Sequence, residues 1–279
     1  MIKSPRAMLD EIGLKPKKSF GQNFLNDARI ISAIAQVCVP DTDMKRATVL
    51  EIGAGTGALT SALLERAHNV IAMERDRDLV PLLNLTFADE IADNRLAILE
   101  ADAARFDLRA FFSEKTAPRV LAGNLPYQIT GRLLELATGV ADVIERAVFM
   151  VQREVADRLV ASPSTKDYGG LTVFVRAAFD VTRALAVSRG SFYPAPNVDS
   201  AVVVLTPRAE RIEETRAFRS VVKAAFEQRR KTLRNAWSSL GDKSTIERAA
   251  QTAGVSLDAR GETLDVHAFA RVAAALAQG

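Results

Sequence analysis

The chain has few of the residues that most often carry catalysis or bind metals. It has one cysteine, Cys38, and two isolated histidines, His68 and His267, so the sequence offers no disulfide and no cluster of metal ligands at the usual spacing. It also lacks a G-x-S-x-G or comparable nucleophile motif. Cys38 lies in an apolar helical pattern and is interpreted as a core residue. Any chemistry is therefore expected to come from a bound cofactor or substrate, with no metal.

Long apolar runs are absent as well. No stretch of ~18 uncharged apolar residues occurs, and residues 1–14 lack the apolar centre of a signal peptide. The sequence therefore predicts a cytoplasmic protein without a membrane segment. With 279 residues, 48% of them hydrophobic and 25% charged, the chain can form one large domain, or one large and one small. Nothing in the sequence indicates an oligomer, and a monomer is expected.

Charge is unevenly distributed, although the net charge is only +3. Residues 1–20 contain five Lys or Arg against two Asp or Glu, and residues 211–237 contain eight against three. The rest of the chain is therefore net acidic. Two basic segments favour an anionic partner such as nucleic acid over the alternative, a solvated helix face. The expected contacts are Lys17, Lys18, Lys223, Arg229, Arg230, Lys231 and Arg234.

Apolar patterns between residues 48 and 151 alternate between strand and helix. Strands are predicted at 48–52, 69–73, 96–100, 120–122 and 146–151, and helices at 59–66, 79–87 and 131–138. This alternation predicts an α/β fold, an open and largely parallel sheet with helices on both faces.

The residues on either side of this region follow other patterns. Residues 1–25 are interpreted as a polar, basic arm, and Asn26-Asp27 is a cap signal for the helix that follows. Residues 173–179 and 201–205 are predicted to form two further strands.

After Pro207 the strand patterns cease. Val222, Phe226, Leu233 and Trp237 fall near one helical face, and two shorter helical patterns follow at 246–253 and 266–277. The sequence therefore predicts two domains, an α/β domain at 1–207 that includes the basic arm and a small helical domain at 208–279.

A glycine-rich loop, Gly53-Ala54-Gly55-Thr56-Gly57, joins a predicted strand to a predicted helix. Gly53 and Gly55 permit a tight turn and a close approach of a ligand to the backbone. Glu74 ends the next strand, where its carboxylate could accept hydrogen bonds from both hydroxyls of a ribose. Asp102 follows the third strand and could accept from an adenine amino group. The alternative is that Glu74 and Asp102 are N-cap or surface carboxylates.

Two cofactors that contain adenosine compete for this loop. A dinucleotide would place its pyrophosphate on the helix N-terminus, whereas S-adenosylmethionine has no phosphate and can place its methionine end there. Glu51, directly before the loop, disfavours a diphosphate and suits a cationic sulfonium or ammonium. The G-x-G-x-G spacing also differs from the dinucleotide pattern G-x-G-x-x-G. The sequence therefore favours S-adenosylmethionine.

Asn124-Leu125-Pro126-Tyr127 follows the strand predicted at 120–122. A site that methylates adenine N6 must accept both N6 protons and clamp the ring. Asn124 Oδ1 and the Leu125 carbonyl could accept these protons, Tyr127 could stack on the base, and Pro126 would fix the turn. The alternative is an ordinary strand-to-turn exit with a core tyrosine.

A second aromatic face could come from the Pro-rich segment that begins at Phe192-Tyr193. The alternative reading of Phe192 is an anchor that holds this loop in the core.

Taken together, these segments resemble the family of small-subunit (16S) ribosomal RNA adenine N6-dimethyltransferases. The matching segments occur in the family's order and are 17–25, 51–60, 124–127, 192–201 and 225–235. The resemblance implies a Rossmann-like methyltransferase domain that uses S-adenosylmethionine, with a small all-helical C-terminal domain. It implies that two adjacent adenosines near the 3′ end of 16S rRNA are dimethylated in a late pre-30S particle, as part of small-subunit biogenesis.

By position, the resemblance also implies roles for individual residues. Asn23 and Leu25 would close over the cofactor, and Gly53 in the glycine loop would lie against its methionine part. Glu74 would bind the ribose and Asp102 the adenine. Asn124 would sit between donor and target, and Tyr127 and Phe192 would sandwich the target base.

One departure from the family pattern is Ala54, which stands where many members have proline and should relax the turn slightly. Three other functions stay open: a large-subunit rRNA methyltransferase, a DNA adenine methyltransferase, and a non-catalytic assembly factor. The long C-terminal segment with Arg229-Arg230-Lys231 and the Phe192–Ala201 loop resemble the small-subunit branch more than the large-subunit branch.

Overall fold

The protein, examined as a computed structural model that describes residues 3–278, divides into two compact units. The first contains the residues up to Ala156 together with Val181–Pro207, and the second contains Asp157–Asp180 together with the residues from Arg208 onward. One division point lies at the predicted boundary after Pro207. The segment 157–180 groups with the second unit because its helix α9 (Gly170–Ala178) packs on α10 (Arg216–Glu227) and α13 (Val266–Ala277).

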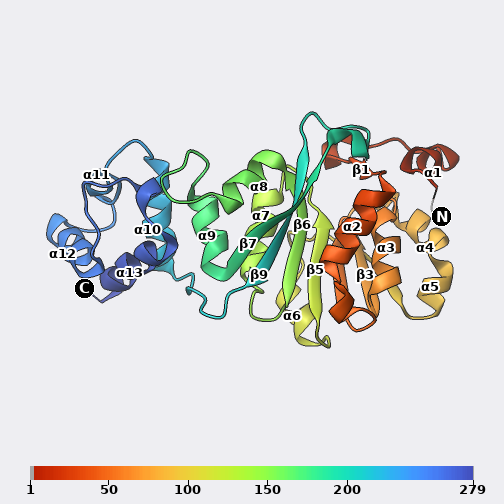
Figure 1. The fold of residues 1–279 in the computed structure, drawn as a ribbon, viewed down its shortest axis with the longest axis horizontal. Coiled ribbons are helices and arrows are strands. Elements are labelled where there is room, and N and C mark those ends of the chain that lie inside the picture. The colour runs from red at the N-terminus through yellow and green to blue at the C-terminus, as the bar shows by residue number, and fades with distance from the viewer. Residues whose placement is uncertain (1–2, 279) are drawn as a thin grey trace. The chain divides into compact units, whose positions relative to one another are not determined.

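A seven-stranded sheet is the framework of the first unit (Figure 1), with the strand order β4-β3-β2-β5-β6-β9-β7. The strands are β2 (Thr48–Ile52), β3 (Asn69–Glu74), β4 (Leu96–Glu100), β5 (Arg119–Asn124), β6 (Arg146–Gln152), β7 (Phe179–Val187) and β9 (Ser200–Pro207). The strands β2 to β6 are parallel, and β9 runs antiparallel to β6. The predicted α/β fold is therefore confirmed, and the five strands predicted between residues 48 and 151 are all present.

Helices that precede β2 or connect the strands in the chain cover the sheet. They are α2 (Ala28–Cys38), α3 (Ala58–Arg66), α4 (Val80–Thr86), α5 (Ala88–Ala92), α6 (Leu108–Ser113) and α7 (Thr130–Thr138). The helix α8 (Arg153–Val160) follows β6 in the chain and contains the division point between the two units. The Asp27 carboxylate caps α2 by accepting from the Arg29 and Ile30 amides, as the cap signal predicts. The helices α2 and α3 lie side by side against the sheet (Figure 1), over a core in which Val49 neighbours Val70 and Val120 in register.

The strand order reverses between β2 and β5, which are adjacent in the sheet although β3 and β4 separate them in the chain. In an open α/β sheet, such a switch point opens a crevice at the carboxyl ends of the strands. Here Ile52, the last residue of β2, lies in register with Gly123. A Cβ on Gly123 would lie 2.4 Å from the Ile52 carbonyl oxygen, so only glycine allows the two strand ends this close approach.

The predicted polar arm at residues 1–25 is wrong in part, because its described residues form packed structure. They contain α1 (Pro5–Glu11), the 3-10 helix η1 (Lys18–Phe20) and β1 (Phe24–Leu25), which pairs with β8 (Phe192–Tyr193). Met8 and Leu9 are buried in a small cluster with Phe24 and Leu79. Two adjacent apolar residues in a short, charged helix are too weak a pattern to predict this packing.

The strand predicted at 173–179 is also wrong, because Gly170–Ala178 forms the helix α9. Its valines and phenylalanines favour a strand by propensity. The Thr172 hydroxyl, however, accepts from the Gly169 N–H at the helix start, and Val173, Val175 and Ala177 are all buried. Burial on several sides removes the helical periodicity from the sequence, so tertiary packing decides the structure. The edge strand β7 that follows is mostly exposed and shows no clear alternation.

The second unit is helical, and no strand follows Pro207 within the described residues. Besides α9, α10 and α13, it contains α11 (Leu233–Ala236), α12 (Lys243–Ala253) and η4 (Gly261–Thr263). The predicted single helical face is wrong, because α10 ends at Glu227 and a loop precedes α11. Leu233 and Trp237 reach the same core after this break, and the Trp237 indole N–H donates to the Val221 carbonyl. None of the helices in the described part is long and apolar enough to cross a membrane.

Candidate active site

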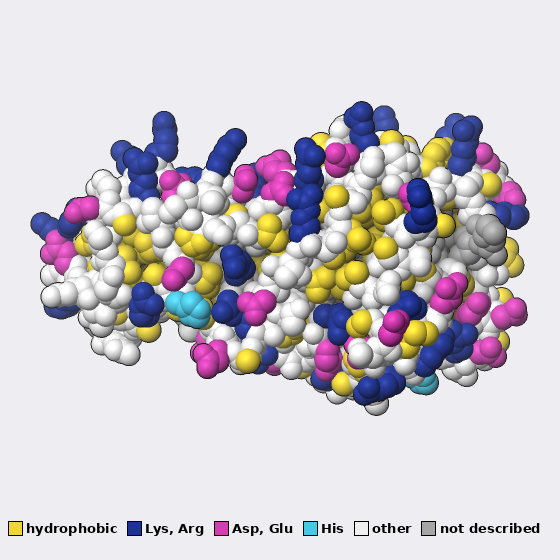
Figure 2. Space-filling model, in the orientation of Figure 1, with side chains coloured by type: hydrophobic (Ala, Val, Ile, Leu, Met, Phe, Trp, Pro, Cys, Tyr) yellow, Lys and Arg dark blue, Asp and Glu magenta, His cyan; other side chains and the backbone are white. Residues whose placement is uncertain are grey.

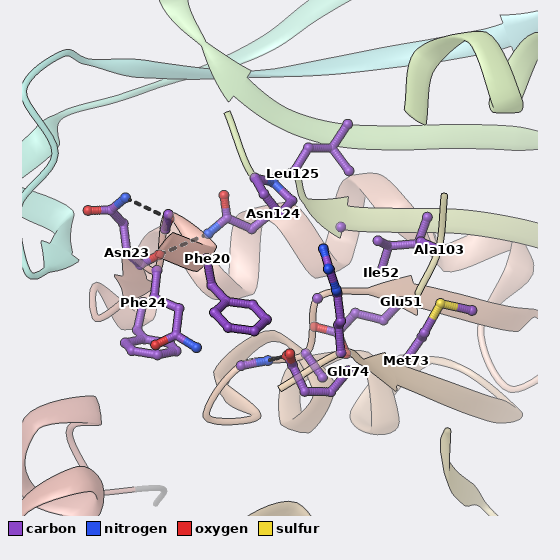
Figure 3. A pocket seen from close by; sticks show the side chains of 18 of the residues that line it. Phe20, Asn23, Phe24, Glu51, Ile52, Met73, Glu74, Ala103, Asn124 and Leu125 are labelled. Atoms are coloured by element: carbon purple, nitrogen blue, oxygen red, sulfur yellow. Dashed lines mark hydrogen bonds between the residues drawn. The ribbon is translucent and has the colours of Figure 1, made fainter. Parts of the chain in front are cut away.

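One cavity lies at the carboxyl ends of β2, β3 and β5, where the strand order reverses (Figure 3). The predicted cofactor residues all line it: Asn23, Leu25, Gly53, Gly55, Glu74, Asp102 and Asn124. Leu125, Pro126 and Tyr127 line it as well, whereas Phe192 does not. Motifs that are up to about a hundred residues apart in the chain therefore meet in one place because parallel strands end at the same edge.

The glycine loop has the left-handed backbone that its glycines permit. Gly53, Gly55 and Gly57 have φ angles of 76°, 60° and 83°. Residues that carry a Cβ adopt such positive φ angles only at a cost in free energy. The Gly55 N–H donates to Glu74 Oε2 at 2.8 Å, and the Ala54 N–H donates to the Met73 carbonyl at 3.1 Å. A proline at position 54 would lack that N–H. Ala54 thus ties the loop to β3 by a bond that the proline of many family members could not make.

Glu51 is the most deeply buried acid of the site, with 1% of its surface exposed. Burial raises the pKa of Glu51 to about 7, although the Thr60 hydroxyl donates to its Oε2 at 2.6 Å and lowers it. The carboxyl therefore gains or loses its charge near neutral pH. A cation bound beside it would favour the charged form.

Glu74 and Asp102 are held by backbone amides at the ends of their strands. Glu74 Oε1 accepts from the Asp76 N–H and Oε2 from the Gly55 N–H, both at 2.8 Å. Burial raises the pKa of Glu74, although these hydrogen bonds oppose it. A carboxylate offers about four acceptor sites, so Glu74 can still accept from a ligand hydroxyl besides the backbone N–H groups of Asp76, Gly55 and Arg75. Asp102 Oδ1 accepts from the Ala104 N–H, and its Oδ2 lies 3.6 Å from Arg75 Nε. Within the described residues, no group of His, Cys, Asp and Glu could hold a metal ion.

Asn124, at the end of β5, has a defined amide orientation. Its Nδ2 donates to the Asn23 carbonyl at 3.0 Å (Figure 3). Because only the NH₂ group can donate, Oδ1 must face away from Asn23 and is left to accept from a ligand. The Pro126 carbonyl already accepts from the Ile129 N–H and the Thr130 hydroxyl, so it serves the turn. The Leu125 carbonyl, which the sequence analysis preferred, is therefore the better second acceptor.

The two predicted aromatic clamps lie in different surroundings. Tyr127 is half-buried at the cavity, and its hydroxyl shares a hydrogen bond of 3.0 Å with Ser200 Oγ. Burial raises the pKa of the Tyr127 hydroxyl, so the ring stays neutral at physiological pH. Phe192 is 5% exposed and packs in the core with Leu25, its β-sheet partner. This burial agrees with the alternative that the sequence left open, a loop anchor, and the role of Phe192 in a clamp stays a prediction.

Several cavity residues escaped prediction from the sequence alone. Phe20 and Arg75 line the cavity, and the Arg75 guanidinium lies 5.5 Å from the centre of the Phe20 ring. Gln22 lines it too, and its amide binds the buried Asp76. In the sequence, Gln22 and Asp76 are marked only by their position, one residue before Asn23 and two residues after Glu74. This nearness to a predicted site residue is a weak indication of a role in the site.

The predicted nucleic-acid contacts separate into paired and unpaired cations. Lys17 binds Asp76 and Asp78, Lys223 lies 3.6 Å from Glu227, Arg229 binds Glu262 and the Lys166 carbonyl, and Arg234 binds Glu247 and Asp258. Lys18, Arg230 and Lys231 are exposed and have no ion-pair partner among the described residues. Figure 2 shows Lys and Arg side chains along the upper edge of the view, with Asp and Glu side chains among them.

The reversed strand order, the glycine loop at the switch point and the acid at the end of β3 define a Rossmann-like nucleotide-binding fold. The solved structures described below place it among the Rossmann-like methyltransferases. The sequence comparisons then identify the branch. A model of the family "Ribosomal RNA adenine dimethylase" matches residues 13–278, and the chain belongs to this family.

Curated relatives and solved structures agree with this assignment. The chain is 44% identical to "Ribosomal RNA small subunit methyltransferase A" of Anaeromyxobacter sp. (strain K), with 96% of this chain and 95% of the relative covered. It is 39% identical to the protein of the same name from Geobacter metallireducens, with 95% and 96% covered. A dimethyladenosine transferase from Plasmodium falciparum superposes with a TM-score of 0.73 at 25% identity, with 89% of this chain and 95% of that one covered. For the 23S rRNA methyltransferase ErmE, the TM-score is 0.66 at 28% identity, with 92% and 100% covered.

Proposed function

We propose that the protein transfers methyl groups from S-adenosylmethionine to N6 of two adjacent adenosines near the 3′ end of small-subunit rRNA, which gives N6,N6-dimethyladenosine. The observation that carries the proposal is the Asn124 amide, fixed by the Asn23 carbonyl at the edge that also holds the glycine loop and Glu74. Relatives named as small-subunit rRNA methyltransferases, at 39–44% identity over nearly the whole chain, support the choice of RNA.

The residues of the cavity suit S-adenosylmethionine. Glu51 and Glu74 supply acidic groups for a cationic ligand with a ribose, and Glu51, directly before the glycine loop, disfavours a diphosphate there. In this assignment Gly53 and Gly55 hold the methionine part, Glu74 the ribose and Asp102 the adenine, while Asn23 and Leu25 close over the cofactor. When bound, S-adenosylmethionine supplies a methyl group already activated by its positive sulfur.

The protein itself mainly orients the acceptor nitrogen. In the first transfer, Asn124 Oδ1 and the Leu125 carbonyl would accept hydrogen bonds from the two N6–H groups, which directs the nitrogen lone pair toward the donor side of the cavity. The methyl group moves from sulfur to N6, S-adenosylhomocysteine is left, and N6 then gives one proton to solvent. These neutral acceptors also disperse the positive charge that develops on N6. Pro126 holds the turn, and the half-buried Tyr127 ring offers a face on which the base can stack. Phe192 completes the clamp only if it leaves the core contacts described above.

The partner is proposed to be a small-subunit (pre-30S) particle, bound by a monomer in the cytoplasm. The unpaired Lys18, Arg230 and Lys231 are the best candidates for phosphate contacts, because Lys17, Arg229 and Arg234 already hold carboxylates of the protein. Phosphate contacts of this kind give affinity that falls with salt.

The test is transfer of labelled methyl groups from S-adenosylmethionine to unmethylated small subunits, large subunits and DNA in parallel. We expect label only in the small-subunit RNA, as dimethyladenosine at two neighbouring positions. Label in large-subunit RNA or in DNA instead would show that the acceptor is wrong. Tight particle binding without any transfer would show that the protein is an assembly factor rather than an enzyme.

A further inference from the structure

Asp76 is a buried acid beside the cavity that is not among the predicted site residues. It is 2% exposed, two residues beyond the end of β3. Oδ1 accepts from Lys17 Nζ at 2.5 Å, and Oδ2 accepts from Gln22 Nε2 at 2.7 Å. Lys17 and Gln22 are tied to each other as well, because the Lys17 N–H donates to Gln22 Oε1 at 2.7 Å. One buried carboxylate therefore holds two residues of the same segment.

This segment, residues 17–25, is here named the covering segment, and it contacts the main parts of the site. The Asn23 carbonyl orients the Asn124 amide. The Phe24 ring packs against the glycine loop so closely that a Cβ on Gly55 would lie 3.0 Å from it. Leu25 pairs with Phe192 in the two-stranded sheet of β1 and β8. The position of the covering segment therefore sets the geometry on both the cofactor side and the target side.

Asp76 also acts on the cofactor side through its backbone. Its N–H donates to Glu74 Oε1, so one residue holds the proposed ribose-binding carboxylate with its main chain and the covering segment with its side chain. Asp78 differs, because its carboxylate is exposed and accepts from the Lys17 ammonium at 2.6 Å, while its N–H donates to Asp76 Oδ1 at 3.2 Å.

We propose that Asp76 is a positioning residue that holds the covering segment closed through Lys17 and Gln22, and thereby fixes the Asn23 carbonyl that orients Asn124. The kinetic part of this inference rests on the proposed function, whereas the closure itself does not. Hydrogen bonds to a buried charge are strong, and removal of one partner leaves the others unsatisfied. Burial by itself would raise the pKa of Asp76, but the bonds from Lys17 and Gln22 outweigh it and lower the pKa, as expected of a charged anchor.

The first experiment is hydrogen exchange on the ligand-free protein, followed in peptides that cover residues 17–25. We expect Asp76→Asn to speed exchange there by roughly tenfold, because the amide keeps the shape of the side chain but loses its charge. Asp78→Asn makes the same change of charge on the same loop and should alter exchange by no more than about twofold. Asp142→Asn breaks an exposed, bidentate ion pair with Arg109 and should leave the covering segment unchanged.

The second experiment measures methyl transfer to unmethylated small subunits by the same variants. We expect Asp76→Asn to raise KM for S-adenosylmethionine roughly tenfold and to lower kcat several-fold at saturation. The loosened covering segment would no longer hold Phe24 against the glycine loop or the Asn23 carbonyl against Asn124, while the main-chain bond from Asp76 to Glu74 remains. A role in stability alone would lower the thermal midpoint without a local change in exchange. If Asp76→Asn folds poorly, Gln22→Leu and Lys17→Met open the same contact from the other side. When Gln22→Leu is combined with Asp76→Asn, it should increase the exchange rate in residues 17–25 and KM only slightly beyond the values of Asp76→Asn alone.

The outcomes separate the closure from the proposed function. Unchanged exchange in residues 17–25 of Asp76→Asn would overturn the closure, whatever the activity. Faster exchange with unchanged KM and kcat would overturn the positioning role. If the wild-type protein transfers no methyl group to small subunits while Asp76→Asn still exchanges faster, the proposed function fails and the closure stands.

Discussion

The sequence predicts functional residues both in the cavity at the sheet edge and in a basic segment of the second unit, residues 229–234, but the structure holds the side chains of these two regions differently. In the cavity, Glu74 and Asn124 end their strands and are fixed by neighbouring backbone groups. In the basic segment, Arg229 and Arg234 bind acids of their own unit, while Arg230 and Lys231 are exposed and have no ion-pair partner in the part of the chain that the structure describes. A strand end limits where a side chain can lie, whereas a count of charges says nothing of their pairing.

The largest effect is expected in the cavity, from Asn124→Ala. The change removes the oriented acceptor, so kcat should fall by about 100-fold or more, as for other fixed groups that stabilise a transition state. The affinity for S-adenosylhomocysteine, measured by calorimetry, should stay within about threefold because Glu74 and the glycine loop remain.

Asn69→Ala is the matched control for Asn124→Ala, since Asn69 also donates its Nδ2 to a backbone carbonyl, that of Asn94, at the opposite end of its strand. It should leave kcat unchanged. Equal losses of turnover and cofactor affinity in Asn124→Ala would contradict the role of Asn124 as an acceptor for the target base.

The second prediction concerns the buried charge of Glu51. The pKa of Glu51 is about 7 in the folded protein against an ordinary value of 4.5, so the folded state binds the proton more tightly. The resulting stabilisation is fully present below pH 4.5 and is lost as the pH rises through about 7. Its size is up to about 3 kcal/mol. Glu51→Gln should therefore be more stable than the wild type above pH 7, but bind a cationic cofactor less tightly.

Urea unfolding at pH 6, 7 and 8, together with calorimetry of cofactor binding, checks the Glu51 prediction. Glu65→Gln, a change of the same type at an exposed position of α3, should keep the wild-type pH dependence. If Glu51→Gln retains the wild-type loss of stability between pH 6 and 8, the charge that responds to pH lies elsewhere.

The third prediction compares the unpaired cations of the basic segment, residues 229–234, with its paired cations. Reversal of Arg230 and Lys231 to Glu should weaken particle binding roughly tenfold and reduce the salt slope by about two, with no change in thermal midpoint. Reversal of Arg229 and Arg234 should instead lower the thermal midpoint, because each would then face the acids it now binds. Filter binding over a salt series and thermal unfolding distinguish the two pairs. An unchanged salt slope for the first pair would place the phosphate contact elsewhere.

The smallest effect is expected from Tyr127→Phe. The change removes the hydrogen bond to Ser200 but keeps the ring, so stability should fall by about 1 kcal/mol and kcat should change by less than about threefold. Tyr127→Leu, which removes the ring, should lower kcat by roughly tenfold or more if the base stacks there. Similar kinetics for the two variants would argue against stacking on Tyr127.

The sequence by itself determined the framework of this protein. The strands between residues 48 and 151, the glycine loop and the strand-end positions of Glu74 and Asn124 follow from apolar periodicity and glycine placement, which are local properties. The strand order of an open α/β sheet then requires the two motifs to share an edge, because parallel strands present their carboxyl ends together. The family resemblance then narrowed the predicted reaction at this edge to methylation of adenine in rRNA.

Only the tertiary structure decided which side chains are free to act. It buried Phe192, made residues 170–178 a helix, paired Arg229 and Arg234, and brought Lys17 and Gln22 onto Asp76. Each of these outcomes depends on contacts between segments that are distant in the chain. Burial and charge pairing are properties of the folded surroundings, so no local pattern in the sequence carries them.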